Sequence, residues 1–326
     1  MERSKGKVVS FKEFMKKALY GEDGYYTKKT SINLDFVTPS NFSLPLSLAI
    51  KRFIEEKSKD MPHYDILEIG GGEGIFCESF LRFNKVSKYF FVEPSSSRKE
   101  LAKKRLNSFK EVIFLNSIDE IKEFVGFIII IEVFDAFPFR RLFKRKNKFY
   151  EIMVDLETKK EFFRSFEDNF LNFFADDITE DSIFEYSEDI IDFLKKLKGK
   201  LKSAYIILID YAENLADILR KKRGTARTFK GHKVFDDLYA QEGQRDITRT
   251  LNIEFLLKKI EISGYTFLGM KNLGDFLKDY LCFIMDYEKK LSPRDKVKLI
   301  SQLNYLVNPE AMGEIYKVFL FKGSNP

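Results

Sequence analysis

The chain has 326 residues, of which 44% are hydrophobic, so it can bury the core of one large domain or of two modest ones. Its net charge of +6, from 56 basic and 50 acidic residues, is too small to predict a nucleic-acid partner. Its 2 cysteines and 2 histidines have neither the spacing of a disulfide framework nor that of a metal site, so we expect no metal. The longest apolar runs, Gly126–Ile131 and Ala204–Ile209, are far shorter than the ~20 residues of a membrane-spanning helix, which predicts no membrane insertion.

The first part of the chain is predicted to be helical. Ser10-Phe-Lys-Glu13 has the form of a capping box, in which the outer two side chains bond each other's backbone N–H groups. Apolar residues recur at helical spacing, at Phe11, Phe14, Met15, Ala18 and Leu19. The stretch lacks the continuous apolar core and the acid-poor composition of targeting segments, so we expect a cytoplasmic protein. Residues 1–63 are interpreted as a helical N-terminal extension, with a loop at residues 27–38.

From residue 64 onward, short apolar strands alternate with helical patterns. The predicted strands are Ile66–Ile69, Tyr89–Val92, Val112–Leu115, Phe127–Ile131 and Tyr205–Ile209. Such alternation predicts a parallel sheet with helices on both faces, which is the α/β fold class. Two late apolar runs, Tyr265–Met270 and Ile315–Phe321, are candidates for edge strands.

Two stretches do not fit this alternation. The gap between the fourth and fifth strands is too long for one crossover, and within it Lys148–Asp155 has the pattern of a strand and Ser182–Leu197 that of a helix. Arg223–Ile253 lacks a sheet pattern. We interpret both stretches as insertions, at about residues 139–200 and 212–262, into a domain of residues 64–326. Ligands of open α/β sheets bind at the carboxyl ends of the strands, so the insertions would form a subdomain on the acceptor side.

The most specific signal is a glycine-rich turn after the first of these strands. Gly70, Gly72 and Gly74 alternate there, and glycine allows both a sharp turn and the close approach of a ligand. The turn lacks the third glycine that NAD-binding proteins space for helix packing, and no Gly-Lys-Ser/Thr of an ATP-binding loop follows. A carboxylate at Glu68 would repel a diphosphate, whereas it suits the cationic sulfonium and ammonium groups of S-adenosylmethionine. The pattern therefore favours S-adenosylmethionine as the cofactor.

Other polar residues extend this candidate nucleoside site. Glu93 follows Gly74 by 19 residues, near the ~20 expected of an acid that bonds ribose hydroxyls. Asn116-Ser-Ile-Asp119 follows the third predicted strand, and Ser117 or Asp119 is expected to bond the adenine edge. The alternative is an ordinary strand-to-helix turn with a solvated Glu93.

Motifs along most of the chain resemble, in the same order, those of the MidA-like family of S-adenosylmethionine-dependent methyltransferases. They are Val9–Tyr20 with Gly24–Tyr26, Asp35–Thr38, Glu132–Pro138, Ile209–Tyr211, Gly224–His232, Asp246–Thr248 and Asn308–Val318. The resemblance implies a Rossmann-like class I methyltransferase sheet and methyl transfer to a protein acceptor, at an arginine side-chain nitrogen. The family includes a mitochondrial complex I assembly methyltransferase, so the resemblance also suggests a respiratory-complex subunit as the partner.

Three departures from the family pattern fall in loops near the expected acceptor. Pro39–Phe42 replaces a segment of Ala/Ser-Pro-Glu type, Ile131 replaces an asparagine, and Tyr211-Ala212 replaces an aromatic residue followed by glycine. These changes bear on the identity of the acceptor more than on the use of the cofactor.

Carboxylates after the fourth and fifth strands are the candidate acceptor-binding residues. Glu132 and Asp135 can hold a guanidinium group bidentately, and their spacing of three directs both to one pocket if the segment is helical. The alternative is that Asp135 caps a helix at Ala136 while Glu132 is solvated or faces the cofactor. Asp210 either shapes the acceptor pocket or caps a turn.

A histidine and two basic runs complete the candidates. His232 is a candidate general base near neutral pH, with a structural or surface role as the alternative. The basic runs at residues 140–148 and 220–223 are interpreted as solvated loops, with docking of an acidic partner or nucleic acid as the alternative. Two other functions stay open: a non-catalytic assembly or binding factor that keeps the fold, and a methyltransferase for small molecules or RNA. The oligomeric state is not predicted.

Overall fold

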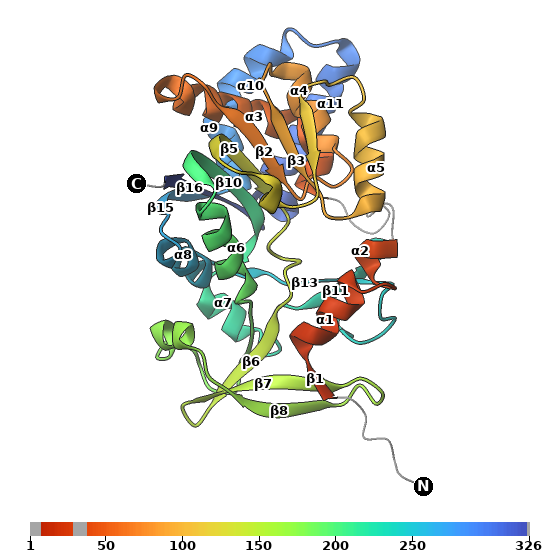
Figure 1. Ribbon diagram of the computed structural model, residues 1–326, viewed down its shortest axis with the longest axis vertical. Coiled ribbons are helices and arrows are strands. Elements are labelled where there is room, and N and C mark those ends of the chain that lie inside the picture. The colour runs from red at the N-terminus through yellow and green to blue at the C-terminus, as the bar shows by residue number, and fades with distance from the viewer. Residues whose placement is uncertain (1–7, 29–37, 325–326) are drawn as a thin grey trace. The chain divides into compact units, whose positions relative to one another are not determined.

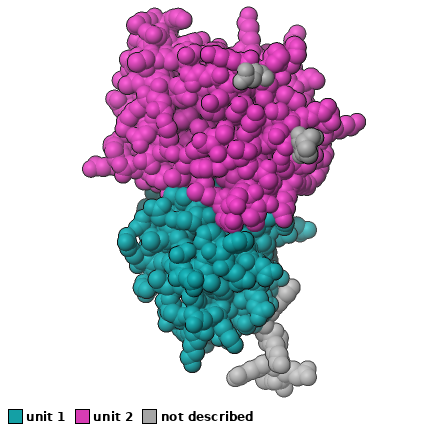
Figure 2. Space-filling model, turned by 90° about the vertical axis from the view of Figure 1, so that its left-hand side faces the viewer, with its two compact units in different colours: residues 1–36, 134–192, 213–256 teal, residues 37–133, 193–212, 257–326 magenta. Residues whose placement is uncertain are grey.

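The structure, a computed structural model, describes residues 8–28 and 38–324. They form two compact units, which Figure 2 colours separately. Unit 1 takes its residues from 1–36, 134–192 and 213–256, and unit 2 from 37–133, 193–212 and 257–326. The family motif at Asp35–Thr38 lies outside the described residues except for Thr38.

Unit 2 is built on a mixed sheet. In spatial order its strands are β15 (Thr266–Asn272), β16 (Tyr316–Ser324), β10 (Leu201–Glu213), β5 (Phe124–Ile131), β2 (Asp65–Ile69), β3 (Tyr89–Val92) and β4 (Val112–Leu115). The strands from β10 to β4 run parallel, whereas β16 pairs antiparallel with both β10 and β15. Taken in chain order, the parallel strands have the doubly wound arrangement 3-2-1-4-5. The predicted Rossmann-like α/β class is confirmed. Both late apolar runs form strands, but β16, which was expected at an edge, is paired on both sides, while β15 lies at the edge of the described sheet.

One apolar cluster of unit 2 lies between one face of this sheet and the helices that cover it (Figure 1). The helices are α3 (Ser43–Lys57), α4 (Ile75–Phe83), α5 (Ser96–Arg105), α9 (Leu273–Asp279), α10 (Leu281–Glu288) and α11 (Pro293–Val307). β5 is fully buried at Phe127 and at Ile128–Ile130, because it lies in the middle of a parallel sheet. The segment Pro39–Phe42, which differs from the family pattern, is a short 3₁₀ helix. Phe42 stacks on Tyr305 of α11, with ring centroids 4.6 Å apart.

Unit 1 holds two smaller sheets. In the first, β1 (Val8–Ser10), β7 (Lys148–Asp155), β6 (Arg140–Arg145) and β9 (Ile183–Tyr186) follow one another, and β8 (Glu161–Phe166) pairs with β7. The second has the order β12 (Lys233–Phe235), β11 (Arg227–Lys230) and β13 (Asp246–Thr248). The helices of unit 1 are α1 (Phe11–Tyr20), α2 (Tyr25–Lys28) and α7 (Leu215–Arg220), and the unit also contains a short strand, β14 (Leu251–Asn252). Two further helices, α6 (Asp189–Lys198) and α8 (Ile253–Ile262), have residues in both units.

Three sequence expectations differ from this fold. The predicted helix at Ser182–Leu197 begins as strand β9 and becomes helical only at Asp189, since aromatic and β-branched residues favour a strand at its start. The stretch Arg223–Ile253 contains a sheet, whose strands of 3 or 4 residues are too short to give a periodic signal. The predicted N-terminal extension is divided, because α1 packs on β6, β7 and β13 of unit 1 whereas α3 packs on α4 and α11 of unit 2. The capping box of Ser10 and Glu13 is confirmed, with bonds of 2.8 and 3.1 Å.

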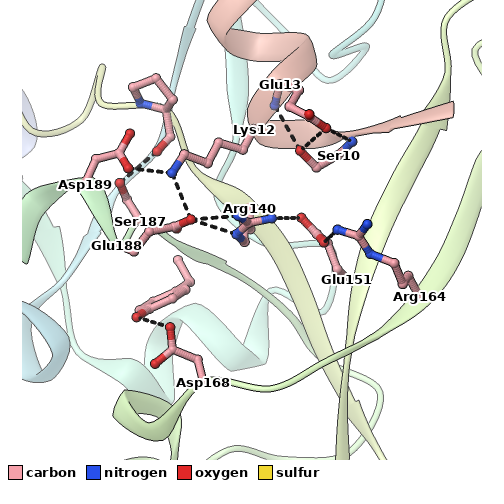
Figure 3. A network of polar contacts seen from close by, with 12 residues as sticks. Ser10, Lys12, Glu13, Arg140, Glu151, Arg164, Asp168, Ser187, Glu188 and Asp189 are labelled. Carbon is pink, nitrogen blue, oxygen red and sulfur yellow. Dashed lines mark hydrogen bonds and ion pairs between the residues drawn. The ribbon is translucent and has the colours of Figure 1, made fainter. Parts of the chain in front are cut away.

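The basic run at residues 140–148 is not a solvated loop, because it forms most of the β6–β7 hairpin. Figure 3 shows Arg140 at the centre of an ion-pair network within unit 1. The Arg140 guanidinium donates to Glu151 Oε1 at 2.5 Å and to Glu188 Oε1 at 2.7 Å, and Arg164 donates to Glu151 Oε2 at 2.6 Å. The Glu151 carboxylate is fully buried, so these two arginines neutralise a charge that water cannot reach. Arg140 therefore has a structural role in unit 1.

Among the described residues, no helix is both long and apolar enough to span a membrane.

Candidate functional site

The glycine-rich turn joins β2 to α4 in unit 2. Gly70, Gly72 and Gly74 have φ angles of 75°, 59° and 77°, a region that favours glycine. A Cβ atom on Gly70 would lie 2.5 Å from Cγ2 of Val133, whereas one on Gly72 would meet nothing within 4 Å. The turn is thus packed against protein at its start and open at Gly72, where a ligand can approach the backbone.

Glu93 ties the end of β3 to this turn. Its side chain is only 2% exposed. One carboxylate oxygen accepts the Gly72 N–H at 2.9 Å and the other accepts the Ser95 N–H at 2.7 Å. The predicted ribose-binding acid therefore lies directly at the open glycine, and it also fixes the conformation of the turn.

Glu68 has a different environment from the one predicted. It lies in β2, is 4% exposed, and accepts a hydrogen bond from the Tyr89 hydroxyl at 2.9 Å. Burial raises the pKa of Glu68 to about 8, against the lowering effect of the Tyr89 hydrogen bond and with a small raising effect from the charge of Glu93. Glu68 is thus mostly protonated at pH 7, so the negative charge expected to repel a diphosphate is largely absent.

Side-chain contacts hold the residues after β4. Ser117 Oγ donates to Asp119 Oδ2 at 3.0 Å, and Lys196 pairs with the same carboxylate at 2.7 Å, which lowers the pKa of Asp119. The neighbouring Asn116 accepts a hydrogen bond from the ammonium group of the buried Lys99. Lysine only donates, so the Asn116 oxygen faces Lys99, and the Asn116 side chain also forms a hydrogen bond with the Glu120 carboxylate.

Glu132 follows β5 in a strained conformation. Its φ angle is 51°, a left-handed value that non-glycine residues rarely adopt. Its backbone N–H donates to the Ile209 carbonyl at 2.9 Å, and its Oε1 accepts a hydrogen bond from the Tyr316 hydroxyl. Tyr316 is 1% exposed, and burial together with the Glu132 charge raises the pKa of Tyr316 well above its usual value. Tyr316 therefore remains a hydrogen-bond donor that positions the Glu132 carboxylate.

The ends of β10 and β16 complete this cluster. Asp210 is fully buried and accepts the Tyr211 N–H at 2.9 Å. The rings of Tyr211 and Tyr316 lie 4.2 Å apart between centroids, at an angle of 34°. Sequence reasoning missed both tyrosines, although Tyr211 directly follows Asp210 and Tyr316 lies within the closing family motif at Asn308–Val318.

Asp135 and His232 belong to unit 1, whereas Glu132 belongs to unit 2. The segment after Glu132 is a turn, closed by a bond of 3.3 Å from Phe137 N–H to the Phe134 carbonyl. The helix that would have aligned Glu132 with Asp135, or that Asp135 would have capped, does not form. Asp135 is buried, and His232 is exposed between β11 and β12 with a φ angle of 60°.

The described residues contain no group of His, Cys, Asp and Glu side chains placed to hold a metal ion. The glycine turn follows β2, and Glu132 follows β5, its parallel neighbour in the sheet. The strand order reverses between these two strands, which is where open α/β sheets bind their ligands. The packing of Val133 against Gly70 brings the two strand ends together.

Comparison with known proteins identifies the family. Residues 48–292 match the model of a family described as "Putative S-adenosyl-L-methionine-dependent methyltransferase". The chain belongs to this methyltransferase family. The resemblance to MidA-like proteins is thereby confirmed, and S-adenosylmethionine is the cofactor.

Two curated relatives of this methyltransferase carry the name "Protein arginine methyltransferase NDUFAF7, mitochondrial". The protein from Danio rerio is 23% identical over 222 residues, 64% of this chain and 50% of the relative. The protein from Xenopus tropicalis is 25% identical over 219 residues, 64% of this chain and 49% of the relative. The methyltransferase thus spans about half the length of the curated relatives it matches.

Solved structures share its fold. A Burkholderia thailandensis protein bound to S-adenosylhomocysteine has a TM-score of 0.81 at 20% identity, covering 98% of this chain and 89% of that one. The plantazolicin methyltransferase BamL has a TM-score of 0.50 at 12% identity, covering 97% and 98%.

Proposed function

We propose that this methyltransferase transfers a methyl group from S-adenosylmethionine to a side-chain nitrogen of arginine in a protein acceptor. The observation that carries the proposal is the strained Glu132 at the end of β5, held by Tyr316 beside the glycine turn. Such strain persists only where the surrounding structure imposes it, and it occurs preferentially at functional sites. The names of the two curated relatives support arginine as the acceptor.

The residues of the glycine turn fit the proposed cofactor. The open backbone at Gly72 leaves room for it, and Glu93 at the same place is suited to accept hydrogen bonds from ribose hydroxyls. Ser117 and Asp119, which follow β4, remain the residues proposed to bond the adenine edge. The bound cofactor supplies a methyl group on a sulfonium, which is reactive enough that alignment and a dry pocket provide much of the rate.

The acceptor residues of unit 2 suit a guanidinium group. A carboxylate accepts several hydrogen bonds at once, so Glu132 can bind guanidinium N–H groups while Tyr316 holds its Oε1. This arrangement would localise the positive charge on the guanidinium nitrogens that Glu132 binds. It would also orient the lone pair of the reacting nitrogen toward the methyl group. Asp135 and Asp210 remain proposed acceptor-site residues, and His232 remains a proposed general base. The role of the insertions in acceptor binding is likewise a proposal. The cytoplasmic location stays a prediction, since both curated relatives are named as mitochondrial.

Calorimetry with S-adenosylmethionine tests the cofactor half. The Gly72→Asp side chain would enter the open space at the turn and should weaken binding at least tenfold. Gly231→Asp is the matched control, because Gly231 has a similar φ of 57° and equally open surroundings in a hairpin of unit 1. Equal affinities of the two variants would remove the turn from the cofactor site.

Transfer of a labelled methyl group to lysate protein tests the acceptor half. Glu132→Gln keeps the side chain's shape and loses its charge, so cofactor affinity should persist while transfer falls about 100-fold or more. Transfer by Tyr316→Phe should fall less than transfer by Glu132→Gln, since the Glu132 carboxylate remains. The exposed Glu261, replaced in Glu261→Gln, provides a control that should transfer normally. Unchanged transfer by Glu132→Gln would exclude it from the acceptor site.

A further inference from the structure

Strand β8 presents an open edge. Among the strands that the structure describes, β8 pairs with β7 alone, and residues 161–165 are all exposed. At the start of the pairing, the Asp155 N–H donates to the Lys160 carbonyl at 3.0 Å. Backbone groups alternate along an antiparallel strand, so those of Phe163 and Ser165 point away from β7. This edge can accept a further strand (Figure 1).

Aromatic side chains flank the open edge on both faces of β8. Phe163 is 60% exposed on one face, and Phe162 is 47% exposed on the other. The Phe163 ring packs edge-on against Phe143, with centroids 5.0 Å apart, and Phe143 stacks on Tyr150 at 5.4 Å. We call these four residues and the open edge the β8 surface.

Basic groups adjoin the β8 surface at the tip of the β6–β7 hairpin. The Arg145 guanidinium lies over the Phe143 ring, 5.2 Å from its centroid, and also pairs with Asp181. Lys146 and Lys148 are exposed, and no carboxylate of the described residues forms an ion pair with either ammonium group. A partner that carries negative charge therefore complements this end of the surface.

We propose that an extended segment of the acceptor protein, with acidic and apolar residues, adds to β8 as a further strand. Main-chain hydrogen bonds along the open edge would supply affinity, and the exposed phenylalanines would contact alternate side chains of the segment. The open edge favours a peptide over RNA, because its backbone groups are spaced to match those of another polypeptide strand. This inference rests on the proposed methylation of a protein.

The test compares three variants at the β8 surface by transfer of tritiated methyl groups to heat-treated lysate protein. Ser165→Pro removes an outward N–H and leaves the pairing with β7 intact. Phe163→Ser removes an exposed ring, and Lys148→Glu reverses a charge. Val297→Ser, at a residue 72% exposed on α11, is the matched control. Urea unfolding and calorimetry with S-adenosylmethionine confirm that each variant folds and binds the cofactor.

The three surface variants should raise the KM for lysate protein about tenfold, which equals ~1.4 kcal/mol of binding, and leave kcat within twofold. Val297→Ser should match the native chain. Protein labelling that is unchanged in all three variants, or a loss confined to kcat, would overturn the docking surface while the proposed function stands. Label that the native chain places only in RNA or small molecules, or nowhere, would overturn the proposed function and with it this inference.

Discussion

Glu68 makes the stability of the chain depend on pH. Its folded pKa is raised to about 8, whereas an exposed glutamate titrates near ~4.3, so the folded chain holds a proton that the unfolded chain loses between these values. This contribution to stability is full below about pH 4 and declines as pH rises to about 8. Glu68→Gln cannot ionise and keeps an oxygen for the Tyr89 hydroxyl.

We therefore expect the free energy of unfolding of Glu68→Gln to be close to that of the native chain at pH 5. At pH 8 it should be larger than that of the native chain by a few kcal/mol. Urea unfolding at both pH values measures this difference. Glu93→Gln provides a comparison for a second buried glutamate of the same turn. A Glu68→Gln difference that is the same at pH 5 and pH 8 would show that the carboxyl group is ionised in the folded chain.

Local contacts at the site were predictable, and distant ones were not. Gly70, Gly72 and Gly74 predict a turn with positive φ angles, because only glycine adopts such angles freely. The position of Glu93 follows from the regular length of a strand–helix–strand unit. The bond between Tyr316 and Glu132 joins residues 184 positions apart. No periodicity in one sequence reports such a pair, because it depends on β16 joining the sheet beside β10.

At the scale of elements, the hairpin of β6 and β7 depends on a buried charge. Replacing Glu151 by alanine leaves the Arg140 guanidinium partly buried without one of its carboxylates, so Glu151→Ala should destabilise the chain by about 3–5 kcal/mol. Glu123→Ala breaks an ion pair whose side chains are 61% and 65% exposed, and should change stability by less than about 0.5 kcal/mol. Chemical unfolding measures both losses in the free energy of unfolding, and equal losses for the two variants would contradict a structural role of the buried Glu151 charge.

The elements themselves were predicted best where a strand is wholly apolar or alternates regularly between apolar and polar residues. The strands at Tyr89–Val92, Val112–Leu115 and Lys148–Asp155 have the bounds that the sequence pattern predicts. The strands of unit 1 at Ile183–Tyr186 and Arg227–Lys230 were missed, since each buries a charged or polar side chain among its apolar ones. Glu185 in β9, for example, is buried and accepts hydrogen bonds from the Thr225 N–H at 3.0 Å.

At the scale of the molecule, the two units interleave along the chain. Unit 1 collects three separate segments, and unit 2 collects three others. Sequence periodicity reports which residues form a strand or helix, but not which segments share a core, so the predicted extension at residues 1–63 crosses the boundary between units.

The central claim is that this methyltransferase modifies arginine in a protein. The most direct test is a mass spectrum of lysate protein after incubation with S-adenosylmethionine that carries a deuterated methyl group. Deuterated methyl groups are expected on arginine side-chain nitrogens of a defined protein, present with the native chain and with Glu261→Gln, and nearly absent with Glu132→Gln. Deuterated methyl groups on another residue type, or equal labelling of arginine by the native chain and Glu132→Gln, would contradict the central claim.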